Sequence, residues 1–256
     1  MLIVISPAKT LDYETPTQIA DYSLPAYVSD AEELVRRARR YSVADLMAVM
    51  EVSEAIAELN VQRFHEWHTP FTPHNAKPAL LAFKGEVYSG LKAATMDVED
   101  FNFAQRHLRI LSGLYGLLRP LDLMQPYRLE MGRKIDNQRG KNLYEFWDDT
   151  ITKGLNSQFE LLGSEYLINL ASTEYFKVIK PKQLKARIIT PAFKENKNGD
   201  YKMLGVYAKK ARGLLSRFII DNRITDPALI KEFAQEGYRY NAPMSSTTHW
   251  VFTRKT

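Results

Sequence analysis

Met1-Leu-Ile-Val-Ile5 opens the chain as an unbroken apolar run, and Ser6 and Pro7 end that run at once. A strand with one face in solvent alternates apolar and polar residues, whereas a continuous apolar run is typical of a strand buried on both faces. We therefore expect residues 2–5 to form a central strand of a sheet. Function often lies just beyond such a strand, which directs attention to the segment after Ile5.

Helix and strand signals follow after a loop over residues 7–27 that contains three prolines. Capping boxes at Ser29-x-x-Glu32 and Ser42-x-x-Asp45 predict two helix starts, and Ser53 and Asp97 predict two more. Hydrophobic periodicity predicts one helix that begins at Ser42. It predicts further helices over residues 31–41, 53–67, 97–107, 142–162, 208–223 and 226–235. Strands are expected over residues 78–83, 166–170, 186–193, 201–207, 237–240 and 250–253. Residues 108–111 fit either a strand or the end of the preceding helix.

The order of these elements predicts one α/β domain over residues 1–256. Hairpins and helix crossovers both occur, the former marked by the Asn198-Gly199 turn, so we expect a mixed α+β arrangement with a central mixed sheet flanked by helices. No repeat, low-complexity tract or linker interrupts the chain. The length of 256 residues and the ordinary composition exclude a disordered, collagen-like or coiled-coil protein.

The charge is distributed unevenly along the chain. Residues 1–100 carry 9 Lys and Arg against 15 Asp and Glu, a net −6, whereas residues 101–256 carry 26 against 15, a net +11. A basic excess confined to one part of a chain is expected of a protein with a phosphate-rich partner. The alternative is a Lys-rich surface that only faces solvent.

Cysteine is absent, which excludes disulfides, thiolate zinc sites, iron–sulfur clusters and thiol redox centres. The histidines at 65, 68 and 74 lack the spacing of a zincin and are expected to be structural. We therefore expect no metal and no cofactor. The first apolar run is too short for a signal peptide or a membrane span, so we expect a cytoplasmic protein without a membrane partner.

The segment 207–220 is the most strongly basic helix candidate. Its apolar residues form one stripe, which leaves four cations on the remaining surface: Lys209, Lys210, Arg212 and Arg217. Small residues beside Lys and Arg allow a helix to approach a polyanion, and each neutralised phosphate adds to affinity. A solvated helix face is the alternative. Further basic residues cluster over 119–141 and 177–187.

The segment 111–122 is a glycine-punctuated turn between apolar runs. Gly113 and Gly116 would let backbone N–H groups approach a phosphate, as in a helix-hairpin-helix element, although a plain tight turn is the alternative. Downstream, Arg128 and Glu130 fall on the same side of an extended segment and can form a salt bridge.

Two serines follow predicted strands. Ser6-x-x-Lys9 has the spacing of penicillin-recognising acyl enzymes but lacks their other motifs, so we interpret Lys9 as a fixed positive charge at the mouth of a cleft. Ser172 follows the strand over 166–170 and is a candidate helix cap. Walker loops, dinucleotide fingerprints and nucleophile elbows are absent, so the familiar nucleotide-binding folds have no support.

Six long stretches match the sequence pattern of a known family in order. They are Ile5-Ser-Pro-Ala-Lys-Thr-Leu11, Phe83-Lys-Gly-Glu-Val-Tyr88, Leu111-Ser-Gly-Leu-Tyr-Gly-Leu-Leu-Arg-Pro-Leu-Asp122, Pro126-Tyr-Arg-Leu-Glu-Met-Gly132, Ile168-Asn-Leu-Ala-Ser172 with Glu174-Tyr-Phe-Lys177, and Tyr207-Ala-Lys-Lys-Ala-Arg-Gly213. Over nearly its whole length the chain resembles the YaaA peroxide-stress family, also called DUF328 or UPF0246.

The resemblance implies an unusual single-domain α/β fold with a basic cleft and a helix-hairpin-helix element. It also implies binding to duplex and branched DNA, without sequence specificity, and a role in limiting iron-dependent oxidative damage. The best hairpin candidate, Gly113–Gly116, has two residues between its glycines where the usual element has one. We expect the cleft to be lined by basic residues of the matching stretches and the basic helix, namely Lys9, Arg128, Lys209, Lys210, Arg212 and Arg217.

A second hypothesis is an enzyme that acts on a phosphate-bearing small molecule or a nucleic-acid end in the same cleft. The matching stretches hold more hydroxyls and carboxylates than passive phosphate contact needs, with Glu130 or Tyr175 as the proton-transfer group. Direct iron sequestration is a third and weaker hypothesis, because the chain has five His and no Cys.

Overall fold

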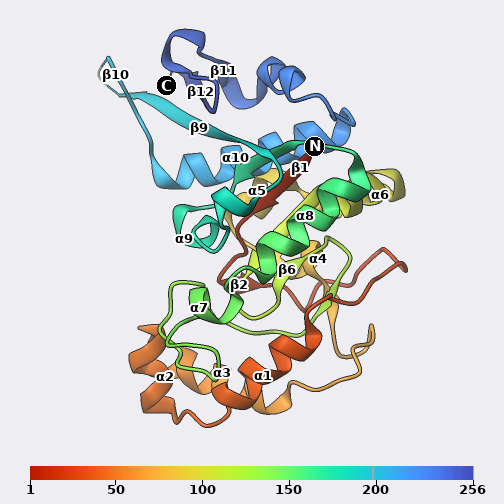
Figure 1. The fold of residues 1–256 in the computed structure, drawn as a ribbon, viewed down its shortest axis with the longest axis vertical. Helices are drawn as coiled ribbons and strands as arrows, with labels where there is room; N and C mark the ends of the chain where they lie inside the picture. Colours follow the sequence, from red (N-terminus) through yellow and green to blue (C-terminus); the bar gives the residue numbers. More distant parts are fainter. Residues whose placement is uncertain (198, 256) are drawn as a thin grey trace.

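The N-terminal apolar run forms strand β1 (Leu2–Ile5), whose four residues are all buried. In the computed structural model, which describes residues 1–197 and 199–255, β1 lies between β5 (Leu108–Ser112) and β8 (Tyr166–Leu170) and is parallel to both. Figure 1 shows β1 in red at the centre of the molecule. The prediction of a central strand is therefore confirmed.

The described strands build one mixed sheet of eight strands in the order β11-β12-β9-β8-β1-β5-β6, with β10 attached to β9. The four pairs from β12 to β5 are parallel, and β6, β10 and β11 each pair antiparallel with a neighbour. The remaining bounds are β6 Gly116–Leu118, β9 Arg187–Lys197, β10 Asp200–Lys202, β11 Arg239–Tyr240 and β12 His249–Arg254. Two small sheets pair β2 (Thr10–Leu11) with β4 (Phe83–Lys84) and β3 (Lys77–Pro78) with β7 (Leu123–Met124).

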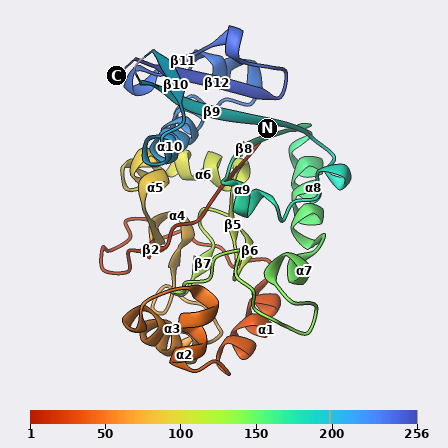
Figure 2. The same ribbon diagram turned by 90° about the vertical axis from the view of Figure 1, so that its left-hand side faces the viewer.

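Helices flank the sheet on both sides, as the order of the predicted helices and strands indicated. Figure 2 shows α8 (Thr150–Leu162) on one side and α5 (Glu86–Leu91), α6 (Val98–His107) and α10 (Gly205–Asp221) on the other. The acidic helices α1 (Val28–Ala38), α2 (Val43–Met50) and α3 (Glu54–Glu66) form a separate layer at the end of the molecule away from β9 and β12. The short elements are α4 Ala79–Ala82, α7 Leu143–Trp147, α9 Thr173–Phe176, and the 3-10 turns η1 Ala93–Thr95, η2 Pro181–Gln183, η3 Pro227–Glu232, η4 Gln235–Gly237 and η5 Ala242–Met244.

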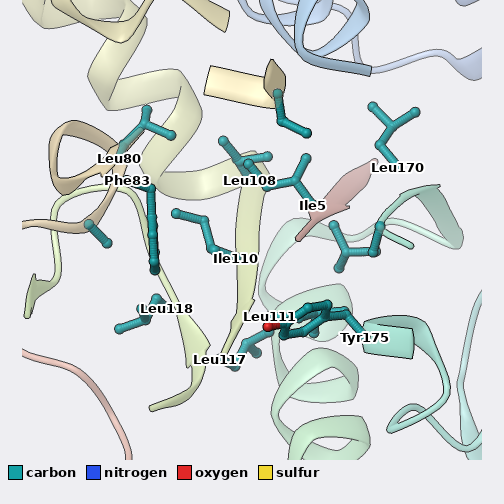
Figure 3. Close-up of a cluster of buried hydrophobic side chains, with 14 of the residues drawn as sticks. Ile5, Leu80, Phe83, Leu108, Ile110, Leu111, Leu117, Leu118, Leu170 and Tyr175 are labelled. Carbon is teal, nitrogen blue, oxygen red and sulfur yellow. The ribbon is translucent and has the colours of Figure 1, made fainter. Parts of the chain in front are cut away.

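The core is continuous from the sheet to its covering helices. Side chains of Ile5, Ile110 and Leu170, from three adjacent strands, lie in one buried cluster with Phe83 and Tyr175 (Figure 3). Burying this much apolar surface against both faces of the sheet is the main stabilising contribution in such an architecture.

Several local predictions are confirmed by hydrogen bonds. The capping boxes at Ser42 and Asp97 are both formed, each with reciprocal bonds to the acidic residue three positions on. Residues 108–112 are a strand. The hairpin of β9 and β10 pairs Asp200 with Lys197, and Asn198 of its predicted turn lies outside the described residues.

Other boundaries differ from the expectation. The predicted helix over 142–162 breaks into α7 and α8 at Asp148, whose φ is 36°. The strand expected over 78–83 is instead β3, the short helix α4 and β4, because a short apolar run does not distinguish a strand from a buried helical turn. Ser29 caps nothing, since α1 already begins at Val28. Residues 226–235 form 3-10 turns rather than an α-helix.

Candidate functional site

The topology of the sheet creates a crevice where β1 and β8 end side by side. After β1 the chain next joins the sheet at β5, whereas after β8 it next joins at β9. Because β8 and β1 are neighbours in the strand order β9-β8-β1-β5, these two connections run in opposite directions along the sheet. In open sheets with parallel strands, the point where the connections diverge is the usual position of a ligand, outside the carboxyl ends of the strands. Here the residues at that point are Ser6, after β1, and Ser172, shortly after β8.

The two serines are hydrogen-bonded to each other across 166 residues of sequence. The Ser172 backbone N–H donates to Ser6 Oγ at 2.8 Å, and Ser6 Oγ lies 3.3 Å from Ser172 Oγ. The Tyr88 hydroxyl donates to the Ser6 carbonyl at 3.1 Å, which ties α5 to the same strand end. These bonds hold the floor of the crevice in one geometry.

A cavity of about 410 Å³ opens at this point, within the usual range for a small-molecule site. Five predicted site residues from four segments of the chain line it together: Lys9, Glu130, Tyr175, and Lys209 with Arg212 on α10. Ser6 and Ser172 line it as well. The sequence named these residues one by one, and the fold brings them to a single place.

Glu130 is the buried anion of the cavity, with only 6% of its side chain exposed. Its Oε1 accepts from Arg128 Nη2 at 3.1 Å and lies 3.4 Å from Lys9 Nζ, and Arg133 Nε lies 4.0 Å from Oε2. Oε2 is buried and accepts no hydrogen bond from any residue that the structure describes. The carboxylate is thus held by three cations, and its second oxygen is buried without a hydrogen bond from the described residues.

Four cations line the cavity and are called its rim below, Lys9, Lys84, Lys209 and Arg212, and the carboxylates of Glu86, Glu130 and Glu174 line it as well. Lys84 and Lys209 are exposed, and Arg212 is half-buried, with a pKa that burial lowers. Within residues 1–197 and 199–255, none of these three side chains forms a salt bridge. A half-buried guanidinium without a counter-ion is costly unless a ligand supplies the negative charge. The arrangement is suited to an anion.

Close contact between α5 and α10 brings this rim together. A β-carbon at Gly90 would lie 2.2 Å from the Lys210 carbonyl, and one at Gly213 would lie 1.8 Å from the Val87 carbonyl. The two helices therefore touch backbone to backbone, side by side in Figures 1 and 2. The crossing places Lys209 and Arg212 beside the Lys84–Tyr88 segment.

Tyr175 forms part of the cavity wall and is itself buried. Burial raises its pKa well above the ordinary value for tyrosine, so its hydroxyl stays protonated at neutral pH. Tyr175 can therefore donate a proton or a hydrogen bond but cannot act as a base. Of the two proton-transfer candidates, Glu130 is the one that can accept.

Three predicted basic residues do not line the cavity. Arg128 lies behind Glu130 and is bonded to it, as a salt bridge of the kind that the spacing indicated. Lys210 pairs with Glu236 at 2.6 Å. Arg217 donates to Thr95 Oγ1 and pairs with Asp221, which makes it a structural residue between α10 and the segment after α5.

The prediction of a helix-hairpin-helix turn at Gly113–Gly116 is wrong, because this turn joins the strands β5 and β6. Leu114 and Tyr115 within it are fully buried. A β-carbon at Gly113 would lie 2.3 Å from the Leu129 carbonyl, and Gly116 has a φ of +67° against the ring of Trp147. Tight packing explains both glycines, and a phosphate has no access to this turn.

Sequence reasoning missed Lys84 and Glu174 as cavity residues. Both lie in stretches that match the family, but neither stands in a basic run. Glu174 Oε1 accepts from the Gly132 backbone N–H at 2.9 Å, which fixes the chain just beyond Glu130. Only the folded arrangement relates these residues to the others.

The described part of the chain holds no group of three or more His, Asp or Glu side chains that could bind a metal ion. His68 and His74 line a different cavity, and His68 Nδ1 lies 2.7 Å from the Glu66 carbonyl. The helices of this part include none with the length and apolar character needed to cross a bilayer.

Comparison with known proteins agrees with the motifs. The family model described as "Peroxide stress protein YaaA" matches residues 1–244. A UPF0246 protein of Aliivibrio fischeri strain MJ11 is 55% identical over 255 residues, covering 100% of this chain and 98% of that protein. A UPF0246 protein of Burkholderia cenocepacia strain HI2424 is 52% identical over 257 residues, covering 100% and 99%. The chain therefore belongs to the YaaA peroxide stress protein family, UPF0246.

Proposed function

We propose that this peroxide stress protein binds duplex or branched DNA in the cytoplasm, without sequence preference, and so limits iron-dependent oxidative damage. The observation that carries the proposal is the basic rim of the cavity, formed by Lys9, Lys84, Lys209 and Arg212. Three of these four cations have no salt-bridge partner among the described residues, so their charge is available to phosphates.

The charge distribution supports a polyanionic ligand over a single small anion. Two of the rim cations, Lys209 and Arg212, belong to residues 101–256, which carry a net +11. Phosphate contacts of this kind carry no base information, which accounts for the proposed lack of sequence preference. Affinity is expected to fall steeply with salt, because each neutralised phosphate releases counterions.

The test is fluorescence anisotropy of labelled duplex and four-way-junction DNA at low and physiological salt. Lys209→Glu is expected to weaken binding to all sequences alike and to reduce the salt slope by about one charge. Lys182→Glu is the matched control, since Lys182 is also exposed but does not line the cavity. Equal affinity of the wild type and Lys209→Glu would remove the rim from the interface, and no binding at low salt would overturn the DNA proposal.

A second candidate function is an enzyme in the same cavity, acting on a phosphate-bearing small molecule or a nucleic-acid end. The observation in its favour is that polar side chains line the cavity together with the cations, namely Ser6, Ser172 and Glu130. Glu130 would accept a proton and Tyr175 would donate one.

An assay for turnover distinguishes the enzyme from a protein that only binds DNA. Incubation with nucleotides and with nicked, flapped or branched DNA, with and without Mg²⁺, is expected to yield a product if the cavity is catalytic. Glu130→Gln should then lose that product while still binding the substrate. Absence of any product over this panel would count against the enzyme and leave the binding function in place.

A further inference from the structure

The cavity that His68 and His74 line, called the second cavity below, is separate from the one with the basic rim. Its volume of about 640 Å³ is within the usual range for a small-molecule site, and the two cavities have no lining residue in common in the described part of the chain. Its walls come from the loop after β2 (residues 13–17), the end of α3, residues 67–77, and residues 125–126 after β7. The proposed function uses none of these residues.

Buried polar side chains hold the walls of the second cavity in place. Lys77 Nζ donates to the carbonyls of Asp12 and Thr15, each at 2.7 Å, and so ties the loop after β2 to the end of the 67–77 segment. Gln125 accepts from the His68 backbone N–H at 3.1 Å and donates to the His68 carbonyl at 2.7 Å, which ties the same segment to β7. A cavity that is formed in advance spares a ligand the cost of ordering its walls.

Most polar side chains of the second cavity already have partners within the protein. The Asn75 amide nitrogen, which can only donate, lies 3.1 Å from His68 Nε2, and His68 Nδ1 lies 2.7 Å from the Glu66 carbonyl. Nε2 of His68 therefore accepts and Nδ1 donates. The Tyr13 hydroxyl donates to the Met124 carbonyl at 2.6 Å. The hydroxyls of two further lining residues bond within their own loop, Thr15 and Thr17.

Arg63 differs from these groups because it has no counter-ion. Its side chain is half-buried and lines the second cavity from α3, and among residues 1–197 and 199–255 no carboxylate forms a salt bridge with it. Burial lowers its pKa, but a guanidinium keeps its proton at neutral pH. The charge is therefore partly desolvated without compensation, at a position that a ligand in the cavity can reach. His74 also lacks a hydrogen bond to the described residues, but it is exposed to water.

The other charges around the second cavity favour an anion with a single negative charge. The ammonium of Lys77 is balanced by Asp12, whose Oδ1 lies 3.7 Å away. Glu66 also lines the cavity, and its exposed carboxylate accepts from Gln62 Nε2 at 2.8 Å rather than pairing with Arg63. One uncompensated cation with a carboxylate on the same cavity favours a monoanion over a phosphate dianion.

Much of the remaining surface of the second cavity is apolar. Trp67 contributes its ring, since its indole N–H is already bonded to the Tyr115 hydroxyl at 2.9 Å. Further apolar contacts come from Pro16, Pro73, Ala76 and Pro126. A ligand that fits this surface carries an apolar body beside its negative charge.

We propose that the second cavity binds a small organic monocarboxylate, with the Arg63 guanidinium on its carboxylate and with Trp67 and the prolines against its apolar body. The planar guanidinium matches a carboxylate through two parallel N–H···O bonds, which give the pair both strength and orientation. This site is independent of the basic rim and of the proposed DNA binding, because the two cavities share no described lining residue.

The experiment measures binding of 2-naphthoate to the full chain by isothermal titration calorimetry in neutral buffer. We expect a dissociation constant on the order of 0.1 mM. The uncharged analogue 2-naphthamide, which has nearly the same shape, should bind about tenfold more weakly, because it loses hydrogen bonds between two charged groups. The dianion 2-naphthyl phosphate should bind no more tightly than 2-naphthoate.

Two substitutions on α3 should act in opposite directions. Arg63→Met removes the cation and is expected to weaken binding of 2-naphthoate about tenfold or more. Glu66→Gln removes the opposing charge, keeps an acceptor for Gln62, and is expected to strengthen binding about two- to threefold. Arg106→Met is the control, since Arg106 is exposed and does not line the second cavity, and it should leave the affinity unchanged. Thermal unfolding of each variant verifies that it is folded.

The contrary outcomes are distinct from one another. Absence of 2-naphthoate binding at millimolar concentration would overturn the proposal. Equal affinity of Arg63→Met and the wild type, or equal binding of 2-naphthamide, would reduce the interaction to apolar contact and overturn it as well. Much tighter binding of 2-naphthyl phosphate would identify a phosphate site instead of a monocarboxylate site. Loss of binding in Lys209→Glu but not in Arg63→Met would place the anion at the basic rim. DNA binding is measured separately by anisotropy, so its failure and the failure of this proposal are distinguishable.

Discussion

Gly213 of α10 lies against the Val87 carbonyl of α5, so close that a β-carbon would stand 1.8 Å from that oxygen. Both partners are backbone, so neither can move aside as a flexible side chain would. The crossing therefore depends on glycine at this position. Because Lys209 and Arg212 are on the same helix, the crossing also sets the position of the basic rim.

Gly213→Ala is expected to destabilise the protein by roughly 3 kcal/mol, at the upper end for overpacking, because the two helices must separate. For a chain of this length, that corresponds to a fall in Tm of about 6–12 °C in thermal unfolding. Gly205→Ala on the same helix is the control, since a β-carbon there meets nothing within 4 Å. It should leave Tm unchanged or raise it slightly. Equal changes in Tm for the two substitutions would contradict the close contact of α5 and α10 at Gly213.

Arg212→Met is expected to raise the free energy of unfolding by about 1 kcal/mol, because it removes a half-buried cation without a salt-bridge partner among the described residues. Arg217→Met, five residues further along α10, should lower it by about 2 kcal/mol, since Arg217 bonds to Thr95 and Asp221. Urea unfolding of both variants measures the difference. A destabilised Arg212→Met would show that Arg212 serves the fold rather than a ligand.

His107 makes stability depend on pH near neutrality. Burial lowers its pKa below the ordinary value, while its Nδ1 lies 2.8 Å from the Met1 carbonyl. The unfolded chain therefore binds a proton more readily, and stability is lost as pH falls through the unfolded pKa of about 6.5 toward the lower folded value. Free energies of unfolding measured from pH 8 to 5 should show this decline. His107→Gln should flatten it, and an unchanged profile in that variant would assign the decline to other groups.

Glu195 forms a buried charged cluster that does not line the cavity. It is fully buried, accepts a hydrogen bond from Tyr238, and lies 2.5 Å from Arg254 Nε. Glu195→Ala should cost about 3–5 kcal/mol, because Arg254 loses its main buried partner. Glu160→Ala, which breaks the exposed pair with Lys185, should cost less than about 1 kcal/mol. Comparable losses in the two variants would mean that the buried pair contributes no more than a surface pair.

Local signals in the sequence were sufficient for much of the fold. The continuous apolar run of residues 2–5 predicted the central strand, and the serine and aspartate spacings predicted the caps at Ser42 and Asp97. The break at Asp148 could not be predicted in this way. It follows from tertiary packing, in which the Trp147 indole donates to the Gly113 carbonyl and its ring lies against Gly116.

The individual residues of the candidate site could be predicted from the sequence, but their meeting in one cavity could not. Lys9, Glu130 and Arg212 each had a chemical reason to be named, yet their meeting depends on the order of strands in the sheet. The order of the strands in the sheet cannot be derived from the hydrophobic periodicity of the sequence, because that periodicity describes each strand separately. The same limit explains the error at Gly113–Gly116, where the spacing of glycines was compatible with a turn between helices or between strands.

The bond between Ser6 and Ser172 joins residues that are 166 positions apart, and Arg212 completes the cavity later still in the chain. Contacts between such distant segments form late in folding, because the loop between them must first close. A chain emerging from the ribosome therefore lacks a complete cavity until nearly all of it has been synthesised and α10 has docked on α5. The cavity exists only in the finished molecule.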